Sequence, residues 1–174
     1  MKPDQKPFKQ NLRRINHVLL PSIEKEIKRM YEAGIIAPIR FSKWVSNLVP
    51  TRNKTREIRL CVDLRNLKKN SLKDNYPLPK MDHILQRVVG SSRISLLDRF
   101  SGYNKILVRP DDQDKTTFTT PWGTFKYVKM PFGLKNAGAT FQREMDIAFA
   151  KEIHDFLVIY LDDLLFFPKQ MSNI

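Results

Sequence analysis

Two adjacent carboxylates stand between two apolar runs near the end of the sequence, and this feature restricts the local fold most strongly. The first run covers residues 156–161 (FLVIYL) and the second covers 164–167 (LLFF), with Asp162 and Asp163 between them. Apolar runs of this kind are typical of buried strands, and so short a connection joins them as a hairpin. The sequence therefore predicts a hairpin with both acids at one end. Charges beside so much apolar surface are costly unless they are solvated or neutralised, and a divalent cation would neutralise them.

An ordinary hairpin turn is the alternative for these two acids, since Asp is a favoured turn residue. A third acid favours the metal interpretation. Residues 93–97 (RISLL) are a further expected strand, and Asp98 ends it. If the two strand ends meet in one sheet, Asp98, Asp162 and Asp163 come together as candidate catalytic acids and metal ligands. Such hard oxygen ligands suit Mg²⁺, with Mn²⁺ as the alternative ion, and two bound ions serve phosphoryl transfer.

Other site patterns are excluded by their spacing. In the acidic cluster that starts at Asp111, Thr116 stands where a calcium loop needs Gly and Trp122 stands where it needs Glu, so a solvated turn is expected. No phosphate-binding loop, nucleophile elbow or paired zinc-ligand spacing is found. Cys61 is the one cysteine, which excludes an intramolecular disulfide. Its apolar surroundings predict a small buried residue.

The charge of the chain indicates its partner. Lys and Arg total 31 against 18 for Asp and Glu, a net charge of +13, and they recur from Lys2 to Lys169. A domain with this excess is expected to bind nucleic acid, while a basic protein without such a partner is the alternative. No run approaches the ~18 apolar residues of a membrane span, and the first residues lack the apolar core of a signal peptide. We therefore expect no membrane partner and an intracellular location, in the nucleus, the cytoplasm or an organelle.

The order of the expected elements favours an α+β fold. A helix opens at Pro21-Ser22, with apolar residues at i, i+4 and i+7, and Gly34 closes it. Residues 46–51 and 57–62 form a hairpin whose tip, residues 52–56, is basic. The later elements are a helix over 81–89, strands over 93–97, 105–108, 115–119 and 124–127, and a helix over 139–152. Short strands and helices mixed in this order are typical of α+β domains.

Two boxes of the sequence are distinctive: Tyr160-Leu161-Asp162-Asp163, and residues 130–137 (MPFGLKNA) followed by 139–142 (ATFQ). The first is similar to the Tyr-x-Asp-Asp box of reverse transcriptases, and the second resembles the pol proteins of gypsy-type LTR retrotransposons, particularly those of plants. Further boxes match in the same order, at residues 34–36, 59–63, 76–79, 97–98, 100–103 and 115–118. Any one of these boxes is weak evidence, but together and in this order they are strong, and the similarity spans roughly residues 6–167.

The resemblance implies an RNA-directed DNA polymerase with right-hand architecture. Residues 1–20 would be a basic extension of the fingers, 21–92 mainly fingers, and 93–174 palm with the catalytic hairpin. Asp98, Asp162 and Asp163 would be the catalytic, metal-binding carboxylates, with the carbonyl of Arg99 beside the metal. The implied partners are an RNA or DNA template with its primer and deoxynucleoside triphosphates (dNTPs); the oligomeric state is left open.

The resemblance also implies a set of substrate-binding residues. Arg59 would clamp the incoming triphosphate, a task suited to a guanidinium, with Lys54 and Arg52 helping from the hairpin tip. Tyr103 would be the aromatic gate that excludes a ribonucleotide 2′-OH. Further contacts would come from Phe132 and Gln142 in the nucleotide pocket and from Tyr160 at the primer end. Structural alternatives stay open: Tyr103 and Phe132 as core aromatics, Arg59 paired with Asp63, and Lys54 and Arg52 in a solvated turn.

The sequence departs from the family pattern at Leu64, Lys68, Arg99 and Lys105. Arg99 is the most consequential of these, because a cation beside Asp98 would compete with metal for its carboxylate. The sequence also stops soon after the hairpin, so we expect a domain truncated before the thumb. This leaves a second hypothesis open: a non-catalytic retrotransposon remnant that at most binds nucleic acid.

Overall fold

A computed structural model describes residues 5–52, 58–91, 93–98, 102–153, 155–161 and 163–168, with the side chains of Arg52 and Asp98 left out. The chain divides into two compact units that alternate along the sequence. The first unit comprises residues 1–72 and 103–135, and the second comprises residues 73–102 and 136–174.

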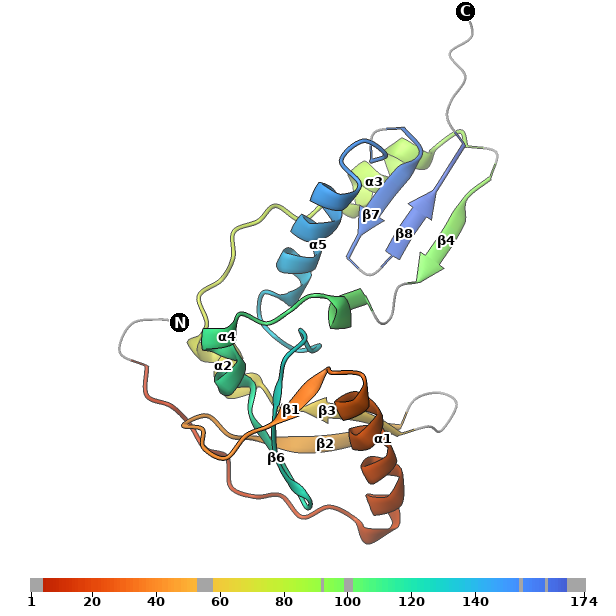
Figure 1. Cartoon of the computed structure of the whole chain (residues 1–174). Helices are drawn as coiled ribbons and strands as arrows, with labels where there is room; N and C mark the ends of the chain where they lie inside the picture. The colour runs from red at the N-terminus through yellow and green to blue at the C-terminus, as the bar shows by residue number, and fades with distance from the viewer. Residues whose placement is uncertain are drawn as a thin grey trace, which may run out of the picture. The chain divides into compact units, whose positions relative to one another are not determined.

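The first unit is built on a five-stranded sheet (Figure 1). Its strands are β1 (Ile36–Pro38), β2 (Ser46–Arg52), β3 (Ile58–Val62), β5 (Phe118–Thr120) and β6 (Gly123–Tyr127). The order across the sheet is β1-β6-β5-β2-β3. The pairing of β2 with β5 is parallel, while the other pairs are antiparallel. Residues 103–135 therefore belong to this unit, because they carry β5 and β6, two of the three inner strands of the sheet.

Helix α1 (Leu20–Glu32) supplies one side of the core of this unit. Its buried residues Ile23, Ile27 and Met30 recur one turn apart and form a cluster with buried side chains of the sheet: Ile36, Leu48, Phe118 and Tyr127. The helix ends at Glu32, and Gly34 follows its C-cap as predicted, with a φ of +63° that is accessible to glycine without steric cost. The N–H of Gly34 donates to the carbonyl of Tyr31, and that of Ile35 to the carbonyl of Met30, which caps the helix C-terminus.

Shorter helical segments complete the first unit. They are η1 (His17–Leu19), α2 (Arg65–Asn70), η2 (Gly102–Lys105, which begins at the boundary of the unit), α4 (Pro110–Gln113) and η3 (Asp114–Thr116). Helix α2, which periodicity did not predict, buries Leu67 in a small cluster with Trp44 and Leu64.

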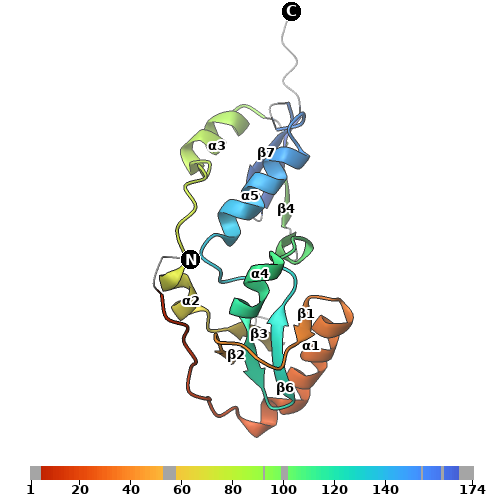
Figure 2. The same cartoon turned by 60° about the vertical axis from the view of Figure 1, so that its left-hand side comes forward.

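The second unit contains a three-stranded antiparallel sheet and two helices (Figure 2). Its elements are α3 (Met81–Val88), β4 (Ser95–Asp98), α5 (Ala137–Ala148), β7 (Leu157–Tyr160) and β8 (Asp163–Phe166). The strand order is β4-β8-β7. Helix α5 contributes Met145, and Phe149 follows at its end; both pack against the buried residues of the hairpin, Leu157, Ile159 and Leu164. The predicted hairpin of two apolar strands is thus confirmed.

Several sequence predictions need correction. The expected strand over 105–108 is wrong, since η2 occupies its start and only a single bridge, between Leu107 and Lys129, follows. The strand expected from residue 115 begins at Phe118, and the helix expected to reach residue 152 ends at Ala148. Cys61 is exposed rather than buried. Along β3, residues 58, 60 and 62 pack toward the core, so strand alternation turns Cys61 to the opposite face together with Arg59.

The acidic cluster of residues 111–114 is neutralised by bases. Arg109 pairs with Asp111, Lys115 with Asp112, and Lys126 with Asp114. The cluster forms the short helix α4 and the start of η3 rather than a simple turn. Among the described residues, no helix is both long enough and apolar enough to cross a bilayer.

Candidate active site

The backbone of the second unit brings two of the predicted catalytic positions directly together. Asp98, the last residue of β4, is the Cα partner of Asp163, the first residue of β8. Asp163 is in turn the partner of Tyr160, the last residue of β7. The end of β4 and the β7–β8 turn therefore lie at the same edge of the sheet. Asp163 and Tyr160 are half-buried there.

Several predicted site residues lie outside the described part of the chain. These are Asp162, Arg99 and Lys54, together with the side chains of Asp98 and Arg52. Within the described residues, no group of three His, Cys, Asp or Glu side chains gathers as a metal site. The side chains of Asp98 and Asp162 lie outside the described residues, so the metal-binding role of the three acids stays a prediction.

The turn that precedes Asp162 is held in an uncommon conformation. Leu161 has a φ of +52°, in the left-handed region that residues with a Cβ adopt at a steric cost. Its N–H donates to Oε1 of Gln142 on α5, at 3.1 Å. The same amide group donates from Nε2 to the carbonyl of Ile159, at 3.3 Å. Gln142 therefore fixes the hairpin backbone on both sides of Tyr160.

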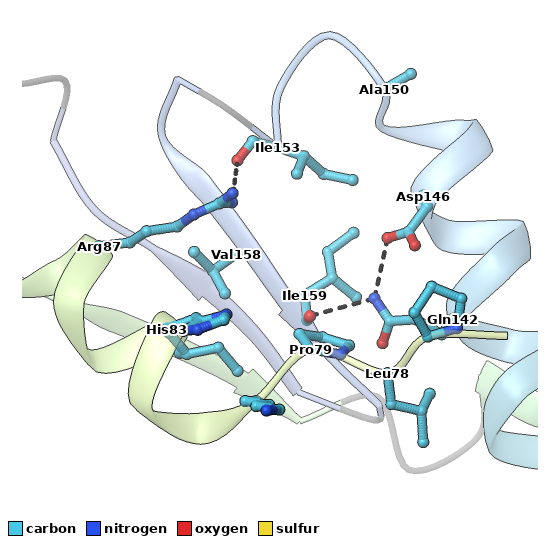
Figure 3. A pocket seen from close by; sticks show the side chains of 13 residues that line it. Leu78, Pro79, His83, Arg87, Gln142, Asp146, Ala150, Ile153, Val158 and Ile159 are labelled. Atoms are coloured by element: carbon cyan, nitrogen blue, oxygen red, sulfur yellow. Dashed lines mark hydrogen bonds between the residues drawn. The ribbon is translucent and has the colours of Figure 1, made fainter.

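Gln142 is only 1% exposed, although the family resemblance implies a nucleotide contact for it. Besides its bonds to the hairpin, Nε2 donates to Oδ1 of Asp146 at 2.9 Å (Figure 3). The contacts described for its amide are thus with the protein, and the nucleotide contact stays a prediction. Helical spacing explains why Gln142 contacts Asp146, since residues four apart lie on one face of α5.

An extended segment, residues 73–80, is tied to α5 by polar contacts. Asp74 accepts two hydrogen bonds from Nη2 of Arg143, at 2.7 and 3.0 Å, and the N–H of Asp74 donates to Asn136. The guanidinium of Arg143 lies 4.6 Å from the centre of the Tyr76 ring, and Tyr76 donates its hydroxyl proton to Asp146 at 2.6 Å. The hydrogen bond to Asp146, followed by burial, raises the pKa of Tyr76.

A cavity of about 620 Å³ opens between this segment, α3, α5 and β7. Figure 3 shows Gln142, Asp146 and Ile159 on one side of it and His83 and Arg87 of α3 on the other. Sequence reasoning missed Tyr76 and Asp146. The available signal was the four-residue spacing of Gln142 and Asp146, while nothing local to Tyr76 indicates that its hydroxyl reaches residue 146.

The first unit carries the other predicted nucleotide contacts. Arg59 is exposed on β3, opposite Thr51 of β2. The alternative of a pair between Arg59 and Asp63 is not supported, because Asp63 forms a two-point ion pair with Arg65, at 2.6 and 2.7 Å. Hydrogen bonding from the Arg65 side chain holds the pKa of Asp63 below its usual range.

Tyr103 and Phe132 form an aromatic pair in the same unit. Their ring centres are 4.6 Å apart and the rings are inclined at 61°. Tyr103 is 5% exposed, whereas Phe132 is 45% exposed. This packing holds the Tyr103 ring in place and agrees equally with a core aromatic and with a rigid gate.

Comparison with known proteins identifies the family. Residues 49–174 match the family model described as reverse transcriptase (RNA-dependent DNA polymerase). The chain is 30% identical over 155 residues to the retrovirus-related Pol polyprotein from transposon 297 of Drosophila melanogaster, covering 87% of this chain and 15% of that protein. It is 38% identical over 117 residues to an RNA-directed DNA polymerase homolog of Oenothera berteroana, covering 67% of this chain and 82% of that relative.

Solved structures share the fold. The protease-reverse transcriptase of prototype foamy virus aligns with a TM-score of 0.82 and 24% identity, over 94% of this chain and 22% of that one. A foamy viral protease-reverse transcriptase in complex with an RNA/DNA hybrid aligns with a TM-score of 0.82 and 20% identity, over 98% and 22% of the two chains. At these identities the likeness shows the fold alone, which confirms the expected α+β class with reverse-transcriptase-like architecture.

The chain thus spans about 15% of the length of the retrotransposon polyproteins that it matches. The family model covers most of the chain, and the Tyr-x-Asp-Asp hairpin lies within the matched residues. On this evidence the chain belongs to the reverse transcriptase family.

Proposed function

We propose that this chain is an RNA-directed DNA polymerase domain that extends a primer with deoxynucleotides. The primer 3′-OH would attack the α-phosphate of a dNTP, forming a phosphodiester bond, breaking the bond between the α- and β-phosphates, and releasing pyrophosphate. The observation that carries the proposal is the register of the second unit, in which Asp98 pairs with Asp163 beside the hairpin turn. Paired positions of antiparallel strands are only about 4.5–5.5 Å apart, so the two residues are near enough to share a cation.

Three carboxylates of this chain fit the metal that the family implies. Asp98, Asp162 and Asp163 would hold Mg²⁺, or Mn²⁺, together with the carbonyl of Arg99, because these are hard oxygen ligands. Bound metal would supply activation of the attacking hydroxyl and stabilisation of the leaving oxygen. The residues themselves would position the reacting groups and offset charge, which supply most of the catalysis in phosphoryl transfer.

Further residues would bind the nucleotide and the primer. Exposed Arg59 is able to offer a planar guanidinium to the triphosphate, with Lys54 as a second cation. Tyr103, braced by Phe132, would reject a ribose 2′-OH because a packed ring cannot move aside. We keep Gln142 as a candidate for the nucleotide pocket and Tyr160 as the primer contact. Residues 21–92 would act mainly as fingers and 93–174 as palm.

The template would be RNA or DNA paired with a primer. The foamy viral enzyme that shares the fold was solved with an RNA/DNA hybrid. The net charge of +13 on this chain supports a polyanionic partner of the same kind.

The first experiment is a primer-extension assay on a primed RNA template, with and without Mg²⁺. Its control is the double variant Asp162→Asn/Asp163→Asn, which removes two charges while changing side-chain volume little. We expect extension by the wild-type chain in the presence of Mg²⁺, and a loss of at least about a thousandfold in the control, since metal positioning carries most of the rate. Template binding by the two proteins should be nearly equal.

Two results would contradict the proposal. Equal extension by the wild-type chain and the control would show that these acids are not catalytic. Template binding without extension, from a folded and monodisperse wild-type sample, would favour the alternative of a non-catalytic nucleic-acid-binding remnant.

A further inference from the structure

A chain of three hydrogen-bonded side chains links the extended segment 73–80 to the hairpin turn. Tyr76 donates its hydroxyl proton to Oδ2 of Asp146 at 2.6 Å, and Oδ1 of Asp146 accepts from Nε2 of Gln142 at 2.9 Å. Oε1 of Gln142 then accepts from the N–H of Leu161 at 3.1 Å. Gln142 and Asp146 lie side by side on α5, facing the hairpin (Figure 3).

The direction of each hydrogen bond determines how the Gln142 amide is oriented. A carboxylate only accepts, whereas a backbone N–H only donates. With Nε2 toward Asp146 and Oε1 toward Leu161, both ends of the amide are satisfied. If the amide flipped, an oxygen would face the Asp146 carboxylate and an NH₂ group would face the Leu161 N–H. Asp146 therefore selects the orientation in which Gln142 holds the turn, and Tyr76 holds Asp146.

The turn needs such support because of its own conformation. Leu161 is branched and bulky, and its φ of +52° places its Cβ near backbone atoms. The Gln142 side chain that accepts from its N–H is 1% exposed, so water does not readily replace this bond. Leu161 directly precedes the two predicted catalytic acids in the sequence.

We propose that Tyr76 and Asp146 are positioning residues of the catalytic centre, which act through Gln142 to hold the backbone of Leu161, the residue that precedes Asp162 and Asp163 in the sequence. This inference rests on the proposed polymerase function. It adds two residues that lie outside the predicted metal and nucleotide contacts. Their effect should fall on the rate of the chemical step, because they contact neither metal nor substrate in this scheme.

The test uses the full 174-residue chain and four variants. Asp146→Leu replaces both acceptor oxygens by methyl groups on the same branched skeleton, and Asp146→Asn retains one oxygen that is able to accept from Gln142. Tyr76→Phe removes only the hydroxyl group. Tyr31→Phe is the matched control, since Tyr31 is an exposed tyrosine of α1 in the other unit.

The first readout is hydrogen exchange of the Leu161 amide, measured by NMR, which does not depend on activity. We expect exchange about tenfold faster in Asp146→Leu and about threefold faster in Tyr76→Phe, with Asp146→Asn and Tyr31→Phe near wild type. Unchanged exchange in both Asp146→Leu and Tyr76→Phe would overturn the inference. If Asp146→Leu fails to fold, as judged by circular dichroism, Tyr76→Phe decides alone.

The second readout is single-nucleotide addition. Asp146→Leu should lower kcat about tenfold while the KM for the nucleotide changes less than about twofold, and Asp146→Asn should recover most of the rate. A rise in KM at constant kcat would instead make these residues part of nucleotide binding, which overturns the positioning role. An inactive wild-type chain would contradict the proposed function, and the exchange data would still test whether the network holds the turn.

Discussion

At the scale of single residues, polar contacts between residues far apart in the sequence join segment 73–80 to α5 in the second unit. Asp74 receives a two-point contact from Arg143, which in turn lies over the ring of Tyr76. The hydrogen bond from Arg143, followed by that from the backbone of Tyr76, holds the pKa of Asp74 below its usual range. A lowered pKa in the folded state means that folding favours the charged carboxylate.

The stability of the fold should therefore depend on Asp74 in acid. Its contribution is fully present above the pKa of the unfolded chain, about 3.9, and is lost as the pH falls through the lower folded pKa. We expect Asp74→Asn to lower the free energy of unfolding at neutral pH and to flatten its decline below about pH 4. Urea denaturation between about pH 7 and pH 3 measures both effects.

Arg143→Met is the matched partner variant for this test. It should flatten the acid decline to the same extent, and the double variant should add little, because the two residues act as one pair. Additive losses, or an unchanged pH dependence in Asp74→Asn, would show that the ion pair does not contribute.

At the scale of elements, hydrophobic period predicted the structure well where one face of an element is buried. Helix α1 and strands β2 and β3 follow the expected ranges within one residue or two. The hydrophobic period did not predict the structure of residues 105–116, where 3-10 turns and the short helix α4 stand in place of the expected strands. The backbone of these segments forms hydrogen bonds with other parts of the chain, as between the N–H of Val108 and the carbonyl of Val128. The local sequence pattern therefore does not determine their conformation.

Strand β5 should be a strong determinant of stability in the first unit. Phe118 is 1% exposed and its ring packs on those of Phe125 and Tyr127, at 6.1 and 5.3 Å between centres. Phe118→Ala is expected to lower the free energy of unfolding by about 3–5 kcal/mol, through lost burial and the cavity left behind. Chemical denaturation followed by circular dichroism measures it.

Phe41→Ala provides the control for this substitution, because Phe41 is 86% exposed. Its effect should stay within about 0.5 kcal/mol. Similar losses for both phenylalanines would mean that Phe118 does not lie in a packed core.

At the scale of the whole molecule, the charge of the chain bears on the proposed binding of nucleic acid. The net charge of +13 is spread along the sequence rather than gathered in a tail. Each phosphate that the protein neutralises releases counterions, so binding weakens as salt is added.

Binding to a primed template should therefore fall linearly on a plot of log affinity against log salt concentration. The slope is expected to be about −0.9 for every duplex phosphate contacted. Fluorescence anisotropy at several salt concentrations measures it, with Asp162→Asn/Asp163→Asn as the comparison, whose slope should be unchanged or slightly steeper. Affinity that does not depend on salt would contradict an electrostatic interface.

The sequence by itself determined the carboxylate hairpin, the capped helix α1, the β2–β3 hairpin and, through its ordered boxes, the family. All of these depend on residues that are close along the chain, where period and turn chemistry act. Only the tertiary structure decided that Asp98 pairs with Asp163, that β5 joins β2 in parallel, and that Tyr76 reaches Asp146. These contacts join residues far apart in the sequence, and their geometry depends on how whole elements pack, which no local pattern records.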